Sequence, residues 1–86
     1  MIELEILTGS DCSLCEAMKR SVARAIRGLE VRVRETNISV DAQLWTKYKN
    51  DIPVLFVNGS KDSQHRIDEK ALRKRLKKEQ QLGKGV

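Results

Sequence analysis

The chain is organised around residues 11–15, which read Asp-Cys-Ser-Leu-Cys and hold both of its cysteines. Across residues 2–6, apolar side chains alternate with two glutamates, a period of two that predicts a strand. After the cysteines, apolar residues recur every three or four positions from Leu14 to Leu29, which is the period of an amphipathic helix. Two cysteines three positions apart at a strand-to-helix junction are therefore the first candidate for a chemical site.

The other periodicities predict the rest of the fold. Residues 29–34 alternate again, with a charged outer face that suits the edge of a sheet, and should pair in parallel with the first strand. A helix is expected over 42–49 and a buried strand over 54–57. The dipeptide at 58–59, Asn-Gly, predicts a turn into a return strand over 63–67. The resulting order, β-α-β-α-β-β-α, predicts an α/β fold with a four-stranded mixed sheet and helices on both faces.

The last helix is predicted to begin after Asp68, a residue type that caps helix N-termini. Ile67 and Leu72 hold the two positions of a hydrophobic staple around that cap. We expect one domain over residues 1–80, because a chain this short supports a single core, and a flexible C-terminal tail over 81–86.

The 86 residues are 40% apolar and 34% charged, with a net charge of +5. No apolar run is long enough to span a membrane, and no signal peptide is evident, so we expect a protein of the reducing cytoplasm. We also expect it to be a monomer. From Lys70 onward the chain carries +6, and residues 1–69 carry −1. With aromatic residues at 3% there is no platform for stacking bases. The basic run is interpreted as a solvated helix face, and contact with an acidic partner protein or an anionic surface stays open. Neither nucleic acid nor membrane is expected as a partner.

The position of the cysteines gives them different predicted chemistry. Cys12 lies at a helix start, where free N–H groups and the helix dipole lower a thiol pKa from about 8.5 to between about 3.5 and 7.5. Asp11 beside it opposes this effect. Cys15, one turn later, is placed to attack a mixed disulfide formed on Cys12.

Other interpretations of the cysteines stay open. They could be inert core residues, or both could hold a metal ion or an iron–sulfur cluster shared between two chains. No complete metal site is expected within one chain, because the single histidine, His65, is predicted to be a half-exposed residue of a distant strand. The aromatic residues Trp45, Tyr48 and Phe56 are expected to pack in the core.

Two motifs together resemble a known family. The first is the cysteine stretch followed by an acidic residue, and the second is the proline that opens the third strand: Cys12-Ser13-Leu14-Cys15-Glu16 and Ile52-Pro53-Val54. They look like the thioredoxin-fold superfamily, and most like a small glutaredoxin-like group with a Cys-x-Leu-Cys site.

The resemblance implies a thiol–disulfide oxidoreductase in which Cys12 is the nucleophile and Cys15 the resolving thiol. It also implies that Pro53 is cis and that the backbone of the residue before it pairs with the substrate. The residues expected to contact substrate are Ser13, Leu14, Ile52 and Pro53. The alternative function is a non-catalytic thioredoxin-fold binding module, or the carrier of metal or an iron–sulfur cluster.

The chain departs from glutathione-dependent glutaredoxins near these motifs. Gly9 stands where they carry a basic residue, and Asp51-Ile52 stands where they carry Thr-Val before the proline. A specific glutathione clamp is therefore not expected. No resident cofactor is expected either. The substrate is predicted to be a disulfide-containing protein or a small thiol, and glutathione or a dithiol partner would supply the electrons.

Overall fold

The computed structural model describes residues 1–84 and has the predicted order of elements. The first half consists of β1 (Ile2–Thr8), α1 (Ser13–Ala25), β2 (Val31–Asn37) and a short 3-10 helix, η1 (Ile38–Val40). The second half consists of α2 (Ala42–Tyr48), β3 (Val54–Val57), β4 (Ser60–Gln64) and α3 (Glu69–Lys84).

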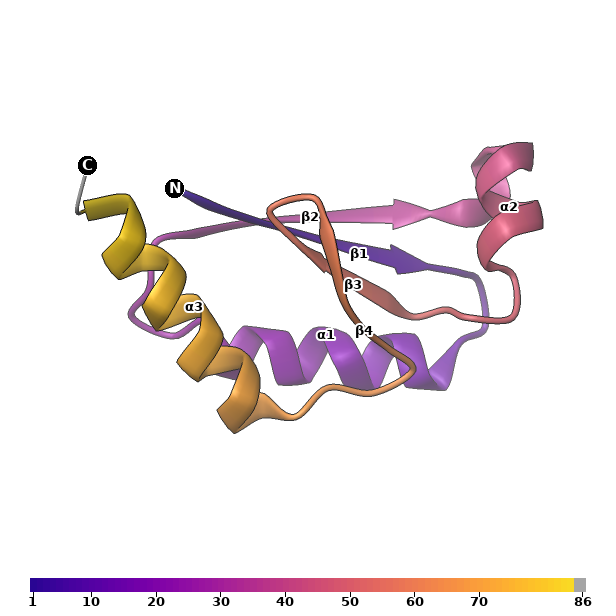
Figure 1. Ribbon diagram of the computed structural model, residues 1–86. Coiled ribbons are helices and arrows are strands. Elements are labelled where there is room, and N and C mark those ends of the chain that lie inside the picture. Colours follow the sequence, from indigo (N-terminus) through magenta and orange to yellow (C-terminus); the bar gives the residue numbers. More distant parts are fainter. Residues whose placement is uncertain (85–86) are drawn as a thin grey trace.

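The four strands form one mixed sheet in the order β2-β1-β3-β4. β1 pairs in parallel with β2 and antiparallel with β3, and β3 and β4 form an antiparallel hairpin. Helices α1 and α3 pack on one face of the sheet, and α2 lies against the other face at one end (Figure 1). The predicted four-stranded mixed sheet with helices on both faces is confirmed, and so is the edge position of β2.

Alternation along β1 divides the two faces of the sheet. Its first, third and fifth residues enter the main core with the apolar faces of α1 and α3: Ile2, Leu4, Ile6, Met18, Val22, Leu72 and Leu76. A smaller core on the opposite face holds Leu7, Ile38 and Val54, with Leu44, Tyr48 and Phe56 packed against it. This second core joins α2 to the end of the sheet where β1 leaves it.

The start of α3 agrees with the predicted cap. The backbone N–H of Ala71 donates to Asp68 Oδ1 at 3.1 Å. Ile67 packs against the core that contains Leu72, as the staple predicts. The helix continues through Lys84, so residues 81–84 of the predicted tail are helical because nothing before Gly83 interrupts a run of good helix formers. Residues 85–86 lie outside the described part of the chain.

The predicted position of the return strand was wrong by three residues. β4 begins at Ser60, immediately after the turn, and Val57 pairs directly with Ser60. Asn58 and Gly59 have φ angles of 49° and 84°, which is the left-handed conformation of a two-residue type I′ turn. Such a turn starts the second strand at once, whether or not the following residues are apolar.

Two predicted environments also differ from the structure. His65 follows β4 instead of belonging to it, and its φ of 68° places it in the left-handed region. Trp45 is 47% exposed instead of buried. Leu44 and Tyr48, one turn apart on α2, face the sheet, so Trp45 lies about 100° around the helix from Leu44 and points outward. Tyr48 and Phe56 pack against the second core, as predicted, and their rings meet edge-on with centroids 6.1 Å apart.

Candidate active site

The two cysteines form a disulfide at the start of α1, with their Cα atoms 5.2 Å apart. Cys12 is the N-cap residue of the helix, and its Sγ accepts a hydrogen bond of 3.0 Å from the backbone N–H of Cys15. Cys12 is partly exposed, whereas Cys15 is only 1% exposed. The structure thus brings the predicted pair together and makes its members unequal, with one sulfur accessible and the other buried.

The chain reaches Cys12 through a short loop after β1. Asp11 in this loop has a φ of 51°, a left-handed conformation that aspartate tolerates better than most residues. Gly9 lies against Ile52, because a Cβ added at Gly9 would be 2.5 Å from Ile52 Cδ1. A basic side chain at position 9, as in glutathione-dependent glutaredoxins, would therefore have to displace Ile52. The close contact with Ile52 is therefore a steric reason for glycine at position 9, which the sequence alone does not show.

Ile52 and Pro53 lie at the same end of the sheet as the disulfide. β1 and β3 pair with Leu7 opposite Val54, so the residues that follow β1 face those that precede β3. The Ile52–Pro53 peptide bond is cis, which confirms what the resemblance implied. Pro53 is buried and Ile52 half-buried. Both predicted residues are thus brought to the edge of the site.

His65 supports the proline segment, a contact that the sequence did not reveal. Its backbone N–H donates to Pro53 O at 2.7 Å, and its Nε2 lies 3.1 Å from Asn50 O. Nε2 must carry a proton to donate to that carbonyl. The loop after β4 is thereby tied to both sides of the cis bond. The only sequence signal was the position of His65 soon after the predicted turn, and that signal does not specify its partners.

Ser13 and Leu14 occupy the first turn of α1 and are both exposed, Leu14 by 38%. Leu14 borders a groove of about 320 Å³ between α1 and the loop after β4. The groove is also lined by Ala17, Met18, Ser21, His65, Arg66 and Ile67. The groove thus begins beside the cysteine motif and is lined by both apolar and polar side chains.

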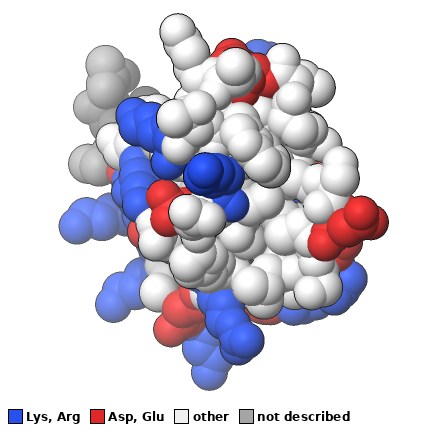
Figure 2. Space-filling view, turned by 90° about the vertical axis from the view of Figure 1, so that its right-hand side faces the viewer, with Lys and Arg blue, Asp and Glu red and all other residues white. Residues whose placement is uncertain are grey.

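Charges near the disulfide come mainly from two carboxylates. Glu16, in the first turn of α1, pairs with Lys19 at 3.1 Å, and this hydrogen bond raises the pKa of Lys19. Asp11 is exposed and makes no ion pair with any side chain in residues 1–81. Figure 2 faces this end of the molecule and shows a broad uncharged area right of its centre, with Lys and Arg gathered along the left and lower edges.

The opposite end of α1 is fixed by Arg73 of α3. Its Nη1 donates to Ala25 O at 2.9 Å and to Arg27 O at 2.7 Å. These carbonyls belong to the end of the helix, where backbone acceptors lack intrahelical donors. The charge pattern of the sequence gave no means of separating this arginine from its basic neighbours.

Together, the element order, the cis proline before β3 and the disulfide at the start of α1 define a thioredoxin-fold dithiol protein. Residues 3–77 match the model of the glutaredoxin-like domain family (DUF836). The chain therefore belongs to this glutaredoxin-like family.

Several solved structures have a similar fold. A structural genomics target protein, XcR50 from X. campestris, is 27% identical with a TM-score of 0.72, over 86% of this chain and 95% of that chain. A mutant thioredoxin from Halobacterium salinarum NRC-1 is 20% identical with a TM-score of 0.62, over 90% and 73% of the two chains. Mitochondrial thioredoxin 3 from Saccharomyces cerevisiae, in its oxidized form, is 16% identical with a TM-score of 0.61, over 90% and 77%. The last two establish the fold alone. The curated proteins contain no match.

None of the helices in the described residues is both long and apolar enough to cross a membrane. The same residues contain no group of three or more His, Cys, Asp or Glu side chains arranged to hold a metal ion. Both cysteine sulfurs are joined in the disulfide.

Proposed function

We propose that this protein is a thiol–disulfide oxidoreductase that reduces disulfides through the Cys12–Cys15 dithiol. The observation that carries the proposal is the inequality of the two sulfurs. Cys12 is accessible and accepts an N–H bond at a helix N-terminus, and Cys15 is buried within bonding reach of it. This arrangement suits a nucleophile followed by a resolving thiol.

The reaction begins from the reduced protein. The Cys12 thiolate attacks one sulfur of a substrate disulfide, forming a mixed disulfide and releasing the first substrate thiolate. Cys15 then gives up its proton and attacks Cys12 Sγ, which forms the intramolecular disulfide and releases the second thiolate. Two electrons pass to the substrate, and the released thiolates take up protons. The Cys15 N–H at 3.0 Å favours the thiolate of Cys12 over its thiol, because it donates to the charged form.

Substrate is held by the surface that surrounds Cys12. The backbone of Ile52, next to cis Pro53, offers hydrogen bonds to an extended substrate segment, and Ser13 and Leu14 border the attacked sulfur. Two features favour a protein substrate over glutathione. Exposed Asp11 beside Cys12 makes no ion pair with a side chain of residues 1–81 and would repel a glutathione carboxylate, and position 9 lacks the cationic side chain that would meet one.

Recycling requires an external reductant, because the product state is the disulfide. A dithiol protein or two molecules of glutathione can supply the two electrons, with no resident cofactor. Such reductants are maintained in the cytoplasm, which we assign as the working compartment. The catalytic unit is a monomer in this proposal, since both sulfurs and the proline segment come from one chain.

The decisive experiment measures turnover and trapping with the same set of variants. Wild-type protein, with a dithiol reductant, should reduce insulin disulfides catalytically. Cys12→Ser should lower the rate to the uncatalysed level, and Cys15→Ser should accumulate a mixed disulfide on Cys12, detectable by mass spectrometry. Ser10→Ala, in the exposed loop before the motif, is the matched control and should retain the wild-type rate.

Turnover that survives Cys12→Ser would overturn the assignment of the nucleophile. A redox titration of the wild-type pair adds the choice of reductant. Equilibration with a dithiol buffer, without a glutathione adduct on Cys12 in glutathione buffer, is the result expected for a protein-directed dithiol.

A further inference from the structure

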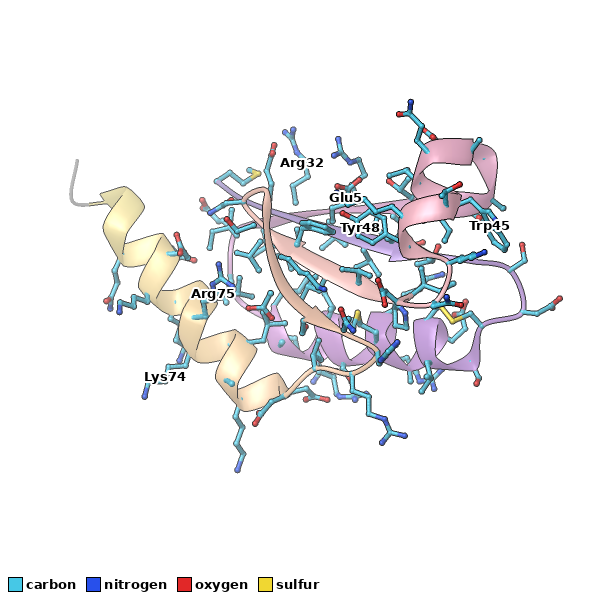
Figure 3. The ribbon with its side chains drawn as sticks, turned by 45° about the vertical axis from the view of Figure 1, so that its right-hand side comes forward. Glu5, Arg32, Trp45, Tyr48, Lys74 and Arg75 are labelled. Carbon is cyan, nitrogen blue, oxygen red and sulfur yellow. A yellow bond between two sulfur atoms is a disulfide. The ribbon has the colours of Figure 1, made fainter. Side chains whose placement is uncertain are left out.

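The basic side chains of α3 divide into two groups in the structure. Arg73 donates to the end of α1, and Arg75 pairs with Asp62 of β4. In Figure 3, Arg75 points toward the sheet and Lys74 points away from the body. The two arginines thus hold α3 against the rest of the protein, Arg73 through hydrogen bonds to backbone carbonyls and Arg75 through an ion pair.

The lysines form a separate outward surface. Lys70, Lys74, Lys77 and Lys78 are all exposed, and none makes an ion pair within the described residues. We call these four residues the lysine stripe. On a helix of 3.6 residues per turn they span about 100° of circumference and about 12 Å of length. The buried residues Leu72 and Leu76 lie on the opposite side.

The acidic residues of α3 do not neutralise the stripe. Glu69 lies on the inner side of the helix and accepts a 2.7 Å hydrogen bond from Arg24 Nε of α1. Glu79 is partly buried and also lies about 100° or more from every lysine of the stripe. A single-sign surface without internal compensation attracts polyanions through its field.

The composition and curvature of the stripe select the kind of polyanion. The other exposed residues of α3 up to residue 81 are Ala71 and Gln81, so this face lacks the exposed aromatic, large apolar or arginine side chains on which protein interfaces depend. The apolar face of α3 is already buried, so the helix has nothing to insert into a membrane. Lys77 and Lys78 lie at the two edges of the stripe, about 100° apart around the helix. A concave partner therefore reaches both of them better than a flat one does. The major groove of B-DNA is about 12 Å wide and lined by phosphates on both walls, which matches a helix about 10–12 Å across.

We infer that the lysine stripe binds the phosphate backbone of duplex DNA without reading its sequence. This differs from the expectation drawn from the sequence, where the basic run could not be separated into anchored arginines and free lysines. The inference also places the DNA-binding surface and the disulfide at opposite ends of α1. α3 is bonded to the C-terminal end of α1, and Cys12 lies at the N-terminal end, about 20 Å away along that helix. DNA on the stripe would leave the disulfide accessible.

Salt dependence measures the number of phosphates that are neutralised. Four lysine contacts predict a slope of about −3.6 in a plot of log K against log salt concentration. Affinity should therefore fall about 150-fold between about 50 and 200 mM salt. Lys74→Gln with Lys77→Gln should reduce the slope to about −1.8.

The experiment is fluorescence anisotropy of a labelled random-sequence duplex, titrated with the full chain at several salt concentrations. The matched control is Lys47→Gln with Lys49→Gln, which removes the same charge from exposed positions at the α2 end. The control should keep the wild-type slope. The stripe variant should also keep the wild-type rate of disulfide reduction, which shows that its dithiol end is intact.

Three outcomes would overturn the inference. One is the absence of salt-dependent duplex binding by the wild type. The second is an equal loss of affinity in the control pair, which would reduce the effect to net charge. The third is tighter binding, at equal salt, to vesicles containing anionic lipid, which would identify a membrane surface as the partner. None of these outcomes depends on whether Cys12 is the nucleophile.

Discussion

Replacing Arg73 by methionine tests how α3 is held to the rest of the protein. The substitution keeps most of the apolar stem and removes the guanidinium, whose Nη1 donates to Ala25 O and Arg27 O at 2.9 and 2.7 Å. A hydrogen bond from a charged donor contributes about 1.5–3 kcal/mol net, and less where water competes. Because Arg73 is partly exposed and one atom serves both carbonyls, we expect a loss of about 2 kcal/mol in the free energy of unfolding.

In a domain of this size that loss lowers Tm by about 8–16 °C. The assay is thermal and urea unfolding of the oxidised protein, followed by circular dichroism, in which the urea midpoint should fall without a change in slope. Lys74→Met, the neighbouring residue on the lysine stripe, is the control and should change stability by less than about 0.5 kcal/mol. The deficit of Arg73→Met should be the same from about pH 5 to 9, because a guanidinium stays charged there. Equal Tm values for the two variants would refute the role given to Arg73.

Two further predictions concern the pH response and the second core. The hydrogen bond from Arg24 lowers the pKa of Glu69, so the stability that this pair contributes is present above the ordinary glutamate pKa of about 4.3 and is lost as pH falls through the lowered folded-state value. Glu69→Gln should therefore have a lower Tm than wild type at about pH 7 and an equal one at about pH 2, and a gap that persists in acid would contradict this. Tyr48→Ala should cost about 2 kcal/mol or more and Trp45→Ala less than about 1 kcal/mol in chemical denaturation, because only Tyr48 packs against the sheet. The reverse order would show that Trp45 contributes to the core.

Local sequence patterns predicted those strands and helices in which buried positions are apolar and exposed positions are polar. Alternation along residues 2–6 specified which side chains of β1 face the helices, and the charged face of β2 specified an edge. The cysteine motif could be placed at a helix N-terminus because the period changes there from two to about three and a half. These signals are strong because a strand or helix that buries one face carries apolar residues at a regular spacing.

The prediction was weakest where backbone geometry or helix phase determines the structure. Ser60, Lys61 and Asp62 contain no apolar residue, so β4 left no alternation to detect, and the turn at Asn58-Gly59 sets its start. The preference of tryptophan for apolar surroundings suggested a buried Trp45. A seven-residue helix, however, can turn only one narrow face to the sheet, and Leu44 and Tyr48 occupy it.

The candidate site shows the same division between local and long-range information. The different roles of Cys12 and Cys15 could be predicted from their positions at the start of a helix. The contacts that position the site, however, join residues that are far apart in the sequence. The bond from His65 to Pro53 O and the contact of Gly9 with Ile52 join segments that no spacing in the sequence relates. Such contacts depend on which residues the strand register places opposite each other, and the sequence alone does not specify this register.

Both ends of α1 carry groups that suit its dipole, and this allows stability and reactivity to be separated. The positive N-terminal end faces the sulfur of Cys12, and the guanidinium of Arg73 lies at the negative C-terminal end. The influence of a helix terminus falls off within its own first or last turn, and here the two ends are about 20 Å apart. Arg73→Met should therefore weaken the fold while the pKa of Cys12 in the reduced protein stays unchanged. A thiol titration that showed a shifted Cys12 pKa in this variant would mean that α1 transmits strain between its ends, and the dithiol could not then be treated as a local site.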